Sequence, residues 1–432
     1  MATYEVGEGG AVLVRPDGYV AWRAASAPPD PARALADAFG QILSRAVLKR
    51  PSRMDASTES SLIPIASPDA LGLDPAKLDR ACEIVMSHIA GGFHPGAQLA
   101  VARHGKLALY RAFGSATVDP SRPVDEATLF PLFSNTKVIT AAAVWTLVEE
   151  GKLRFSDRVA EHVPGFEAHG KQDVTVAHLL THQAGFPAAE VAPECFTDRE
   201  LLRRTVCEFK LEWPPATRSI YHRLAAHWVI AVLIEAVTGA DYRDEIRQRV
   251  IEPLGLSREM FLGLPETEDR RAAVMYTPRQ TEQWPLDPMV AAPAFRRAGI
   301  PGAGGYATAR AMAVFYQMMA QGGAWNVVRI VSSRTIDYVT RDFTGDRVDD
   351  YTGYPMHRGL GPFSLGQSGH PGLGAIGHPR TFGHSGVGTS YCWADPTSGL
   401  SFAFLSNCRR DNAWHNRRMD ILSTLAHASI LE

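Results

Sequence analysis

The chain carries no excess of charge of either sign. Its 432 residues include 44 Lys or Arg and 46 Asp or Glu, which gives a formal net charge of -2, and no long run of one sign occurs. Proteins that bind nucleic acid or anionic membrane surfaces are strongly basic over at least part of their length, so neither partner is expected. This balance fits a small, nearly neutral substrate better.

Long apolar runs and paired cysteines are also missing. No stretch of about 18 apolar residues occurs, and the N-terminal residues lack the basic and apolar segments of a secretory signal. We therefore expect a cytoplasmic protein that does not enter a membrane. The five cysteines are odd in number, scattered and without a CxxC pair, so we expect neither a disulfide framework nor a metal site. These residues, which we expect to be mostly reduced and buried, are Cys82, Cys195, Cys207, Cys392 and Cys408.

The first 60 residues differ in pattern from the rest. The segments AVLV and YVAW within residues 11–22 predict two short strands joined by the turn RPDG, and residues 31–46 predict an amphipathic helix. The polar residues 49–61 predict a linker. The stretch LVRPDGYVAWR resembles the C-terminal tail of flavin-dependent aromatic hydroxylases. The flavin-binding body of that family is missing, so no cofactor is expected.

The remaining chain shows strand and helix signals in an order that indicates a fold class. Hairpins are predicted near residues 97–114 and 390–407, and a buried helix over 134–150 ends at Gly151. Further helices are expected over 74–90, over LAAHWVIAVLIEAVTG up to Gly239, and over 413–430. Hairpins on both sides of a helical region predict an α+β protein, in which helices flank an antiparallel sheet and a mostly helical lobe is inserted.

This order also predicts the domain boundaries. We expect an N-terminal extension at 1–60, made of a strand pair, a helix and the linker, and one large domain at 61–432. Within the large domain, the sheet lobe is expected to span about 61–133 and 300–432, and the helical lobe about 134–299.

Ser134 and Lys137 lie three positions apart at the start of the apolar helix predicted over 134–150. Positions i and i+3 share one helix face, so the hydroxyl and the amine can come within hydrogen-bonding distance. The free N–H groups at a helix start could also receive an oxyanion. Serine is equally a favoured N-cap, and this motif alone leaves both interpretations open.

Two further motifs follow in the chain. Tyr221 precedes a long helix in PPATRSIYHRLAAHW, and His384-Ser385-Gly386 lies on a predicted strand in TFGHSGVGTSYCWADP. With Ser-x-x-Lys in this order, the sequence resembles the serine beta-lactamase and penicillin-binding-protein superfamily, specifically its class C and family VIII carboxylesterase branch. The likeness spans roughly residues 65–430 and includes VTVAHLLTHQAGFP and GGYATARAMAVFYQMMAQGG. It implies a beta-lactamase-like fold with the site in a cleft between the two lobes.

The resemblance implies a role for each motif residue. Ser134 would be the acylated nucleophile and Lys137 would help to deprotonate it. Tyr221, as phenolate or through the lysine, would act as base and return a proton to the leaving alcohol, with Lys137 and His384 helping to stabilise its ionised form. The backbone N–H groups of Ser134 and Val387 would form the oxyanion hole.

Four residues would contact the substrate: Gly386, Ser385, His222 and Arg223. Gly386 would leave the strand open for close approach of the substrate. Arg223 stands where the family commonly has asparagine. If it points into the cleft, it would depress the pKa of Lys137 and favour anionic or carbonyl-rich substrates; if it points outward, it is a surface cation. His384 replaces the lysine whose charge pairs with the antibiotic's carboxylate in true beta-lactamases, so an esterase is favoured.

We therefore predict a serine carboxylesterase that cleaves small-molecule esters through a covalent acyl-enzyme on Ser134. A D-amino-peptidase, a weak beta-lactamase or an acyltransferase with the same residues is the close alternative, and a non-catalytic binding protein is the distant one. His178 and His182 in HLLTH lack the glutamate of zinc proteases, which again argues against a metal. Whether the protein forms a homo-oligomer stays open.

Overall fold

The computed structural model of the protein describes residues 11–14, 20–24, 26–32, 34, 62–367 and 369–431. The chain divides into two units, Met1–Ser60 and Ser61–Glu432. In the first unit, β1 (Ala11–Val14) pairs antiparallel with β2 (Val20–Ala24), as the strand pattern predicts. The helix predicted over 31–46 lies outside the described residues apart from 31, 32 and 34, and the linker predicted over 49–61 lies wholly outside them.

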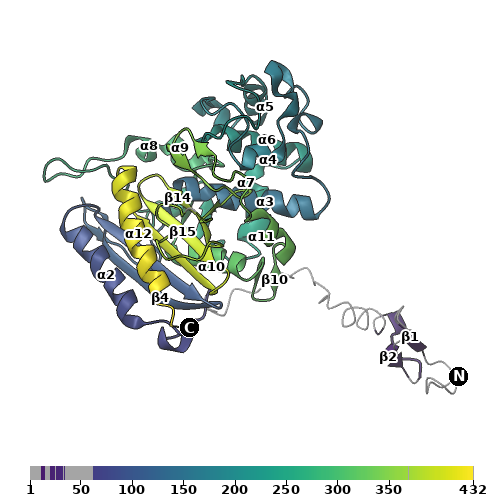
Figure 1. Cartoon of the computed structure of the whole chain (residues 1–432), viewed down its shortest axis with the longest axis horizontal. Helices are drawn as coiled ribbons and strands as arrows, with labels where there is room; N and C mark the ends of the chain where they lie inside the picture. The colour runs from purple at the N-terminus through teal and green to yellow at the C-terminus, as the bar shows by residue number, and fades with distance from the viewer. Residues whose placement is uncertain are drawn as a thin grey trace. The chain divides into compact units, whose positions relative to one another are not determined.

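One seven-stranded antiparallel sheet organises the second unit (Figure 1). The N-terminal hairpin joins the C-terminal hairpin where β16 pairs with β3, with Phe402 opposite Val101. A sheet built from both ends of the chain confirms the predicted fold class. In spatial order its strands are β13 (Phe363–Ser364), β14 (Phe382–Gly386), β15 (Ser390–Asp395), β16 (Leu400–Ser406), β3 (Gly96–Arg103), β4 (Lys106–Thr117) and β5 (Arg122–Pro123).

Helices cover both faces of this sheet, so β3 is buried along its whole length. Helices α2 (Pro75–Ala90) and α12 (Asn412–Ala428) share a core with Leu99 on one face (Figure 1). Helix α10 (Ala309–Ala320) shares the other core with Ala100. Successive side chains of a strand point to opposite faces, so the alternation of large and small residues along β3 separates the two cores.

Some of the predicted helices have the polar N-cap or the terminal glycine that their sequences suggest. Asp74 accepts a hydrogen bond from the N–H of Ala76 at the start of α2. Helix α6 (Ala225–Thr238) ends at Gly239, whose φ of +77° suits glycine because glycine has no Cβ. The other helices are α3 (Thr136–Glu149), α4 (Val176–Leu180), α5 (Arg199–Cys207), α7 (Tyr242–Ile246), α8 (Pro288–Ala291), α9 (Pro293–Ala298) and α11 (Ser333–Val339).

Short strands link the helical segments to the large sheet. The second sheet has the order β6-β8-β7, with Pro131 of β6 opposite Tyr306 of β8. None of the helices in the described ranges has the length and hydropathy that a bilayer-spanning helix needs. The short strands are β6 (Phe130–Pro131), β7 (Met260–Leu262), β8 (Gly305–Ala307), β9 (Ala324–Trp325), β10 (Val328–Arg329), β11 (Val348–Asp349) and β12 (Tyr354–Pro355).

Candidate active site

Ser134 lies in a single 3-10 turn, Phe133–Asn135, that leads into α3. The turn is tight because Phe133 adopts a left-handed φ of +47°, which costs a non-glycine residue about 1 kcal/mol. The Asn135 amide donates to Ser390 Oγ at 2.8 Å, and that hydroxyl donates to the Leu132 carbonyl at 3.0 Å. These bonds fasten the turn to β15. Asn135 occupies the N-cap position of α3, so Ser134 is not the helix cap.

Lys137 lies in the first turn of α3 and is fully buried. Its Nζ is 3.0 Å from Ser134 Oγ and donates to the Gly302 carbonyl at 2.8 Å. Burial, followed by the positive charge of Arg358, lowers the pKa of Lys137 well below its usual value. A neutral amine at this distance can accept the proton of the Ser134 hydroxyl.

The Tyr221 hydroxyl hydrogen-bonds with the Ser134 side chain, and the Tyr221 ring centroid lies 5.1 Å from Lys137 Nζ. Burial raises the pKa of Tyr221 above its usual value, although the Ser134 bond and Arg358 act in the opposite direction. The phenol is therefore protonated near neutral pH. This state suits donation of a proton to a leaving group and is the reverse of the phenolate considered from the sequence.

His384 lies on β14, as predicted, and is fully buried. Its Nδ1 bonds the Ser385 carbonyl at 2.7 Å, which assigns the ring proton to Nδ1 and leaves Nε2 without a partner in the described parts of the chain. Burial, followed by the charges of Lys137 and Arg358, lowers the pKa of His384 well below its usual value. The expectation that His384 stabilises an ionised Tyr221 is therefore wrong, because the imidazole is neutral.

Val387 follows β14 and borders two cavities that also contain Ser134. Its backbone N–H meets no acceptor among residues 62–367 and 369–431, so it is free for an oxyanion. Gly386 serves a different purpose from the one predicted. A Cβ at this position would lie 2.3 Å from the Leu132 carbonyl oxygen and 2.3 Å from Ser390 Oγ. The close approach that needs glycine is therefore that of β14 to the Ser134 turn, and not that of a substrate.

The three remaining predicted contacts differ in position. Ser385 borders the smaller cavity. Arg223 borders the larger cavity but is exposed, so it lies at the edge of the cleft and in contact with solvent. His222 is fully buried and borders neither cavity. Its Nε2 accepts from the Phe186 N–H at 3.1 Å and its Nδ1 bonds the Ile220 carbonyl at 2.7 Å. The substrate contact predicted for His222 is therefore wrong, because both of its ring nitrogens form hydrogen bonds with backbone groups.

The two cavities beside Ser134 differ mainly in size. The larger, about 410 Å³, is mainly apolar and has Arg223, Arg409 and Glu190 among its residues. The smaller, about 100 Å³, also has a mainly apolar surface, although Arg358, Ser385 and other polar side chains border it. A reacting group at Ser134 can therefore extend into a roomy apolar space on one side and a confined space on the other. The apolar residues of the larger cavity include Phe133, Val191, Leu224, Met289, Phe295 and Val387.

A buried ion pair near Ser134 has no counterpart in the predicted site. Arg358 is 1% exposed and its Nη2 lies 2.6 Å from Asp349 Oδ2, which is also fully buried. This guanidinium, and not Arg223, is the cation that lowers the pKa of Lys137. Both partners belong to a long segment without a motif, so no pattern in the sequence identifies them.

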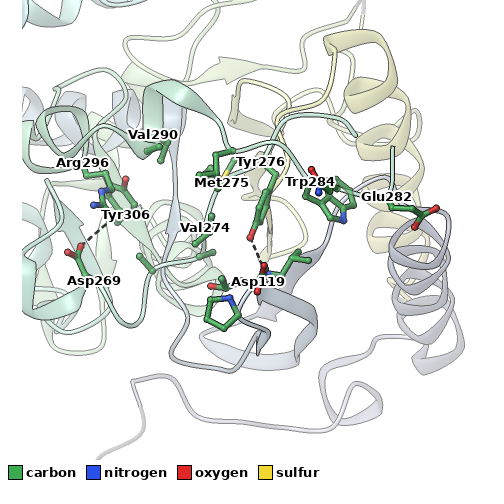
Figure 2. A pocket seen from close by; sticks show the side chains of 18 residues that line it. Asp119, Asp269, Val274, Met275, Tyr276, Glu282, Trp284, Val290, Arg296 and Tyr306 are labelled. Atoms are coloured by element: carbon green, nitrogen blue, oxygen red, sulfur yellow. Dashed lines mark hydrogen bonds and ion pairs between the residues drawn. The ribbon is translucent and has the colours of Figure 1, made fainter. Parts of the chain in front are cut away.

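A cavity larger than either of these lies away from Ser134 (Figure 2). It measures about 830 Å³ and contains Tyr276, Trp284 and Tyr306, but none of the residues around Ser134. Helices α8 and α9 lie between this cavity and the 410 Å³ cavity beside Ser134, because Phe295 borders the cavity beside Ser134 and Arg296 borders the 830 Å³ cavity. It holds no nucleophile beside a neutral base, so we assign no chemistry to it.

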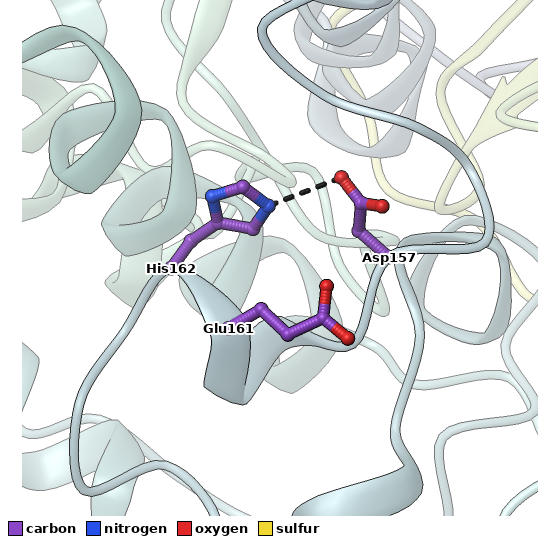
Figure 3. A group of neighbouring side chains, drawn as sticks. All are labelled: Asp157, Glu161 and His162. Atoms are coloured by element: carbon purple, nitrogen blue, oxygen red, sulfur yellow. Dashed lines mark hydrogen bonds and ion pairs between the residues drawn. The ribbon is translucent and has the colours of Figure 1, made fainter.

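One group of side chains in the described ranges has the spacing of metal ligands (Figure 3). The ligand atoms of Asp157, Glu161 and His162 lie within 4.8 Å of one another. Arg154 already donates to both carboxylate oxygens of Asp157, and Arg158 Nε lies 2.9 Å from Glu161 Oε1. These arginines neutralise the carboxylates, so the group fits a network of ion pairs better than a bound cation.

This fold and this site define a hydrolase of the serine beta-lactamase and penicillin-binding-protein superfamily. The family model described as Beta-lactamase matches residues 85–425, and the chain belongs to that family. A second model, described as Aromatic-ring hydroxylase, C-terminal, matches residues 1–46, in agreement with the resemblance of the N-terminal stretch.

Three similar proteins illustrate the range of the family. Esterase/beta-lactamase LipL of Mycobacterium tuberculosis is 30% identical, with 69% of this chain and 72% of the relative covered. A putative D-alanyl-D-alanine carboxypeptidase of Salmonella gallinarum is 28% identical over 81% of this chain and 87% of the relative. The solved structure of a family VIII carboxylesterase is 28% identical and superposes with a TM-score of 0.73 over 82% of this chain and 97% of that one.

Proposed function

We propose that this protein is a serine carboxylesterase that cleaves esters of small molecules through a covalent acyl-enzyme on Ser134. The observation that carries the proposal is the pair of Ser134 and Lys137. The two side-chain heteroatoms are 3.0 Å apart, and burial together with Arg358 favours the neutral form of the amine. An uncharged lysine beside a serine hydroxyl is the arrangement that activates a serine nucleophile without a histidine.

Acylation would begin when Ser134 Oγ attacks the ester carbonyl carbon and its proton moves to Lys137 Nζ. The N–H groups of Ser134 and Val387 would hold the resulting oxyanion. As the bond to the alkoxide breaks, the phenol of Tyr221 would give the leaving oxygen its proton. The proton held by Lys137 would then restore Tyr221, so an alcohol leaves and the site returns to its starting protonation.

Deacylation would repeat the same steps with water in place of the serine. A water molecule would attack the acyl carbon and pass a proton to Lys137 Nζ. When the bond between the acyl carbon and Ser134 Oγ breaks, that proton would return to the serine oxygen. The carboxylic acid leaves, and no metal or organic cofactor is needed for any of these steps.

The surroundings of Ser134 support an ester as the substrate. His384 is neutral and buried, so the third motif offers no cation for the carboxylate of a beta-lactam antibiotic. The larger cavity has an apolar wall that includes Phe133 and Phe295. An ester with an apolar group therefore fits this site better than an antibiotic whose carboxylate needs a cation in the third motif. Two of the similar proteins carry esterase or carboxylesterase in their names.

A peptidase, a weak beta-lactamase and an acyltransferase are alternatives because all three pass through the same acyl-enzyme. The peptidase alternative has support from the carboxypeptidase name of one relative. These activities differ in the leaving group or in the acceptor, so a substrate panel separates them. Hydrolysis should be compared for p-nitrophenyl butyrate, a D-alanyl-D-alanine peptide and the beta-lactam nitrocefin.

We expect the ester to be the best substrate by at least about tenfold in kcat/KM, and Ser134→Ala to lower that turnover at least about 1,000-fold. Ser257→Ala, at an exposed serine outside both cavities, is the matched control and should leave turnover unchanged. Nitrocefin turnover equal to that of the ester would contradict the carboxylesterase assignment. Ligand binding without any turnover would favour the binding-protein alternative.

A further inference from the structure

Arg358 is a buried cation in the wall of the smaller cavity beside Ser134. Asp349 is its ion-pair partner, with Nη2 and Oδ2 2.6 Å apart. The Nε and Nη1 groups of Arg358 have no hydrogen-bond partner among the described residues. A buried guanidinium whose N–H groups are only partly bonded costs more free energy than a fully bonded one, so it is a poor device for stability alone. Its position suggests a different use.

The guanidinium lies against the catalytic tyrosine. Its carbon is 5.1 Å from the centroid of the Tyr221 ring and 5.5 Å from that of the Phe363 ring. Asp349, which pairs with Arg358, is also connected to the backbone near Tyr221. It forms a β-bridge with Ser219, two residues before Tyr221. The ion pair and the tyrosine therefore hold their relative positions through backbone as well as side chains.

Backbone order in this segment does not depend on the guanidinium. Asp349 also accepts hydrogen bonds from the N–H groups of Tyr351 and Thr352, at 3.0 and 3.2 Å. The Arg358 backbone is held separately, because its N–H donates to Thr344 Oγ1 at 2.9 Å. The charge of the arginine is thus the part of this arrangement that the local fold does not require.

We propose that Arg358 is a positioning residue of the hydrolytic site, whose guanidinium, anchored by Asp349, supplies the fixed positive charge that the histidine-containing third motif lacks. This inference rests on the proposed function. The charge would keep Lys137 in the neutral form that accepts the Ser134 proton, and it would make the Tyr221 phenol a better proton donor. Positive charge favours the deprotonated form of each neighbouring group, so both effects have the same sign.

Among the residues that the structure describes, no other permanent cation acts on these two groups. Burial lowers the pKa of each neighbouring histidine and leaves it neutral. Asp349 is the negative charge that opposes Arg358 at Tyr221. Lys137 and Tyr221 are surrounded by further titratable and charged groups from several elements. They are His182 after α4, His222 next to Tyr221, His227 on α6, Asp349 on β11, Tyr351 after β11, Arg358 between β12 and β13, and His384 on β14.

The test is the pH dependence of kcat/KM for p-nitrophenyl butyrate between about pH 6 and pH 10, followed at the isosbestic point of nitrophenol. Turnover rises with pH as Lys137 loses its proton. Arg358→Gln removes the cation, so the pKa of Lys137 rises and the ascending limb should move up by about one pH unit or more. At a given pH on the ascending limb, turnover should fall about tenfold or more and recover at higher pH.

Two further variants separate charge from structure. Arg358→Lys keeps a cation and should return the limb most of the way to its wild-type position. Asp349→Asn removes the opposing negative charge but keeps an acceptor for the Tyr351 and Thr352 N–H groups, so the limb should move to lower pH. Shifts of opposite sign from the two halves of one ion pair are not expected from a loss of packing.

Arg341→Gln is the matched control, because this exposed guanidinium also lies over a tyrosine ring, that of Tyr338, at 5.3 Å. Its profile should equal that of the wild type. An unmoved limb in Arg358→Gln, or an upward shift in Asp349→Asn, would overturn the proposal. If Arg358→Gln does not fold, the Asp349→Asn profile decides.

Ser134→Ala separates the role of Arg358 from the proposed function. Activity that survives in this variant contradicts the proposed function. Activity that depends on Ser134 but shows unmoved limbs in the Arg358 and Asp349 variants contradicts only the role of Arg358.

Discussion

The protonation state of each of three side chains around Ser134 depends on its surroundings, and we assign the roles of base and acid to two of them. Lys137 is buried beside a cation and is therefore a neutral base. The pKa of Tyr221 is raised, so its phenol keeps its proton near neutral pH and can donate it. His384 is neutral and bonded to backbone, which leaves it no charge to offer. The residue types alone do not assign these states, because each depends on burial and on neighbours that are distant in the sequence.

The role of Lys137 can be separated from its contribution to stability. We expect Lys137→Met to lower kcat about 1,000-fold, since the proton acceptor is lost. The free energy of unfolding should fall by only about 1 kcal/mol, less than in the Lys171 control below, because the methionine fills a similar volume and a single carbonyl, that of Gly302, loses its donor. Turnover of p-nitrophenyl butyrate and urea denaturation measure the two quantities.

Lys171→Met is the matched control for this variant. Lys171 is also fully buried, but it donates to the carbonyls of Ala168, Cys207 and Phe209, far from Ser134 in the chain. Its loss leaves these carbonyls unsatisfied and should reduce the free energy of unfolding by at least about 2 kcal/mol while kcat stays near the wild-type value. Equal losses of kcat in both lysine variants would refute a catalytic amine at 137.

At the scale of elements, the site depends on how closely β14 passes the turn before α3. Gly386 allows this approach, because any Cβ would meet the Leu132 carbonyl and Ser390 Oγ. The same two groups belong to the hydrogen bonds that fasten the Ser134 turn to β15. The spacing of nucleophile and oxyanion N–H is therefore a packing property of two elements.

Gly386→Ala tests this packing. We expect the added methyl group to push β14 away from the turn, with a loss of about 1–3 kcal/mol in the free energy of unfolding. The loss of kcat should exceed what this destabilisation explains, since the Val387 N–H moves with the strand. Gly151→Ala is the control, because a Cβ there meets nothing within 4 Å. It should cost about 1 kcal/mol of stability, owing to its φ of +71°, and leave kcat unchanged. A fully active Gly386→Ala protein would show that the close packing is not needed.

Local patterns predict these elements well but not the contacts between them. The helices α2 and α6 and the hairpin of β15 and β16 follow from caps, glycines and periodicity, which act over a few residues. The start of α3 is shifted from 134 to 136, because the left-handed Phe133 has no signature in the pattern. Closeness in the sequence does not predict which residues contribute to the site. His222 is next to Tyr221 in the sequence, but its ring nitrogens bond backbone groups. Arg358 is distant in the sequence, but its guanidinium packs against the Tyr221 ring in the folded protein.

At the scale of the whole molecule, the hydrolytic residues all belong to the unit Ser61–Glu432. Its sheet has strands from both ends of this unit, so an intact pairing of β16 with β3 is required for the site. The N-terminal unit matches the model of a different family. The two units can therefore be tested separately.

A chain of residues 61–432 should fold and hydrolyse p-nitrophenyl butyrate with a kcat/KM within about threefold of the full-length value, because the core residues described on both faces of its sheet belong to this unit. Thermal unfolding and steady-state kinetics of the two proteins provide the comparison. A shortened protein that folds but has lost most of its activity would assign the N-terminal unit a part in catalysis.

The covalent intermediate on Ser134 is the central claim, and the intact mass of the protein after brief mixing with p-nitrophenyl butyrate tests it most directly. We expect a gain in mass equal to one butyryl group, located on Ser134 by peptide mapping and missing in Ser134→Ala, together with loss of nitrophenol release in that variant. If deacylation is too fast for the adduct to accumulate, acid quenching within milliseconds traps it. Equal nitrophenol release by the wild type and Ser134→Ala would contradict the account, because the ester would then be cleaved without this serine.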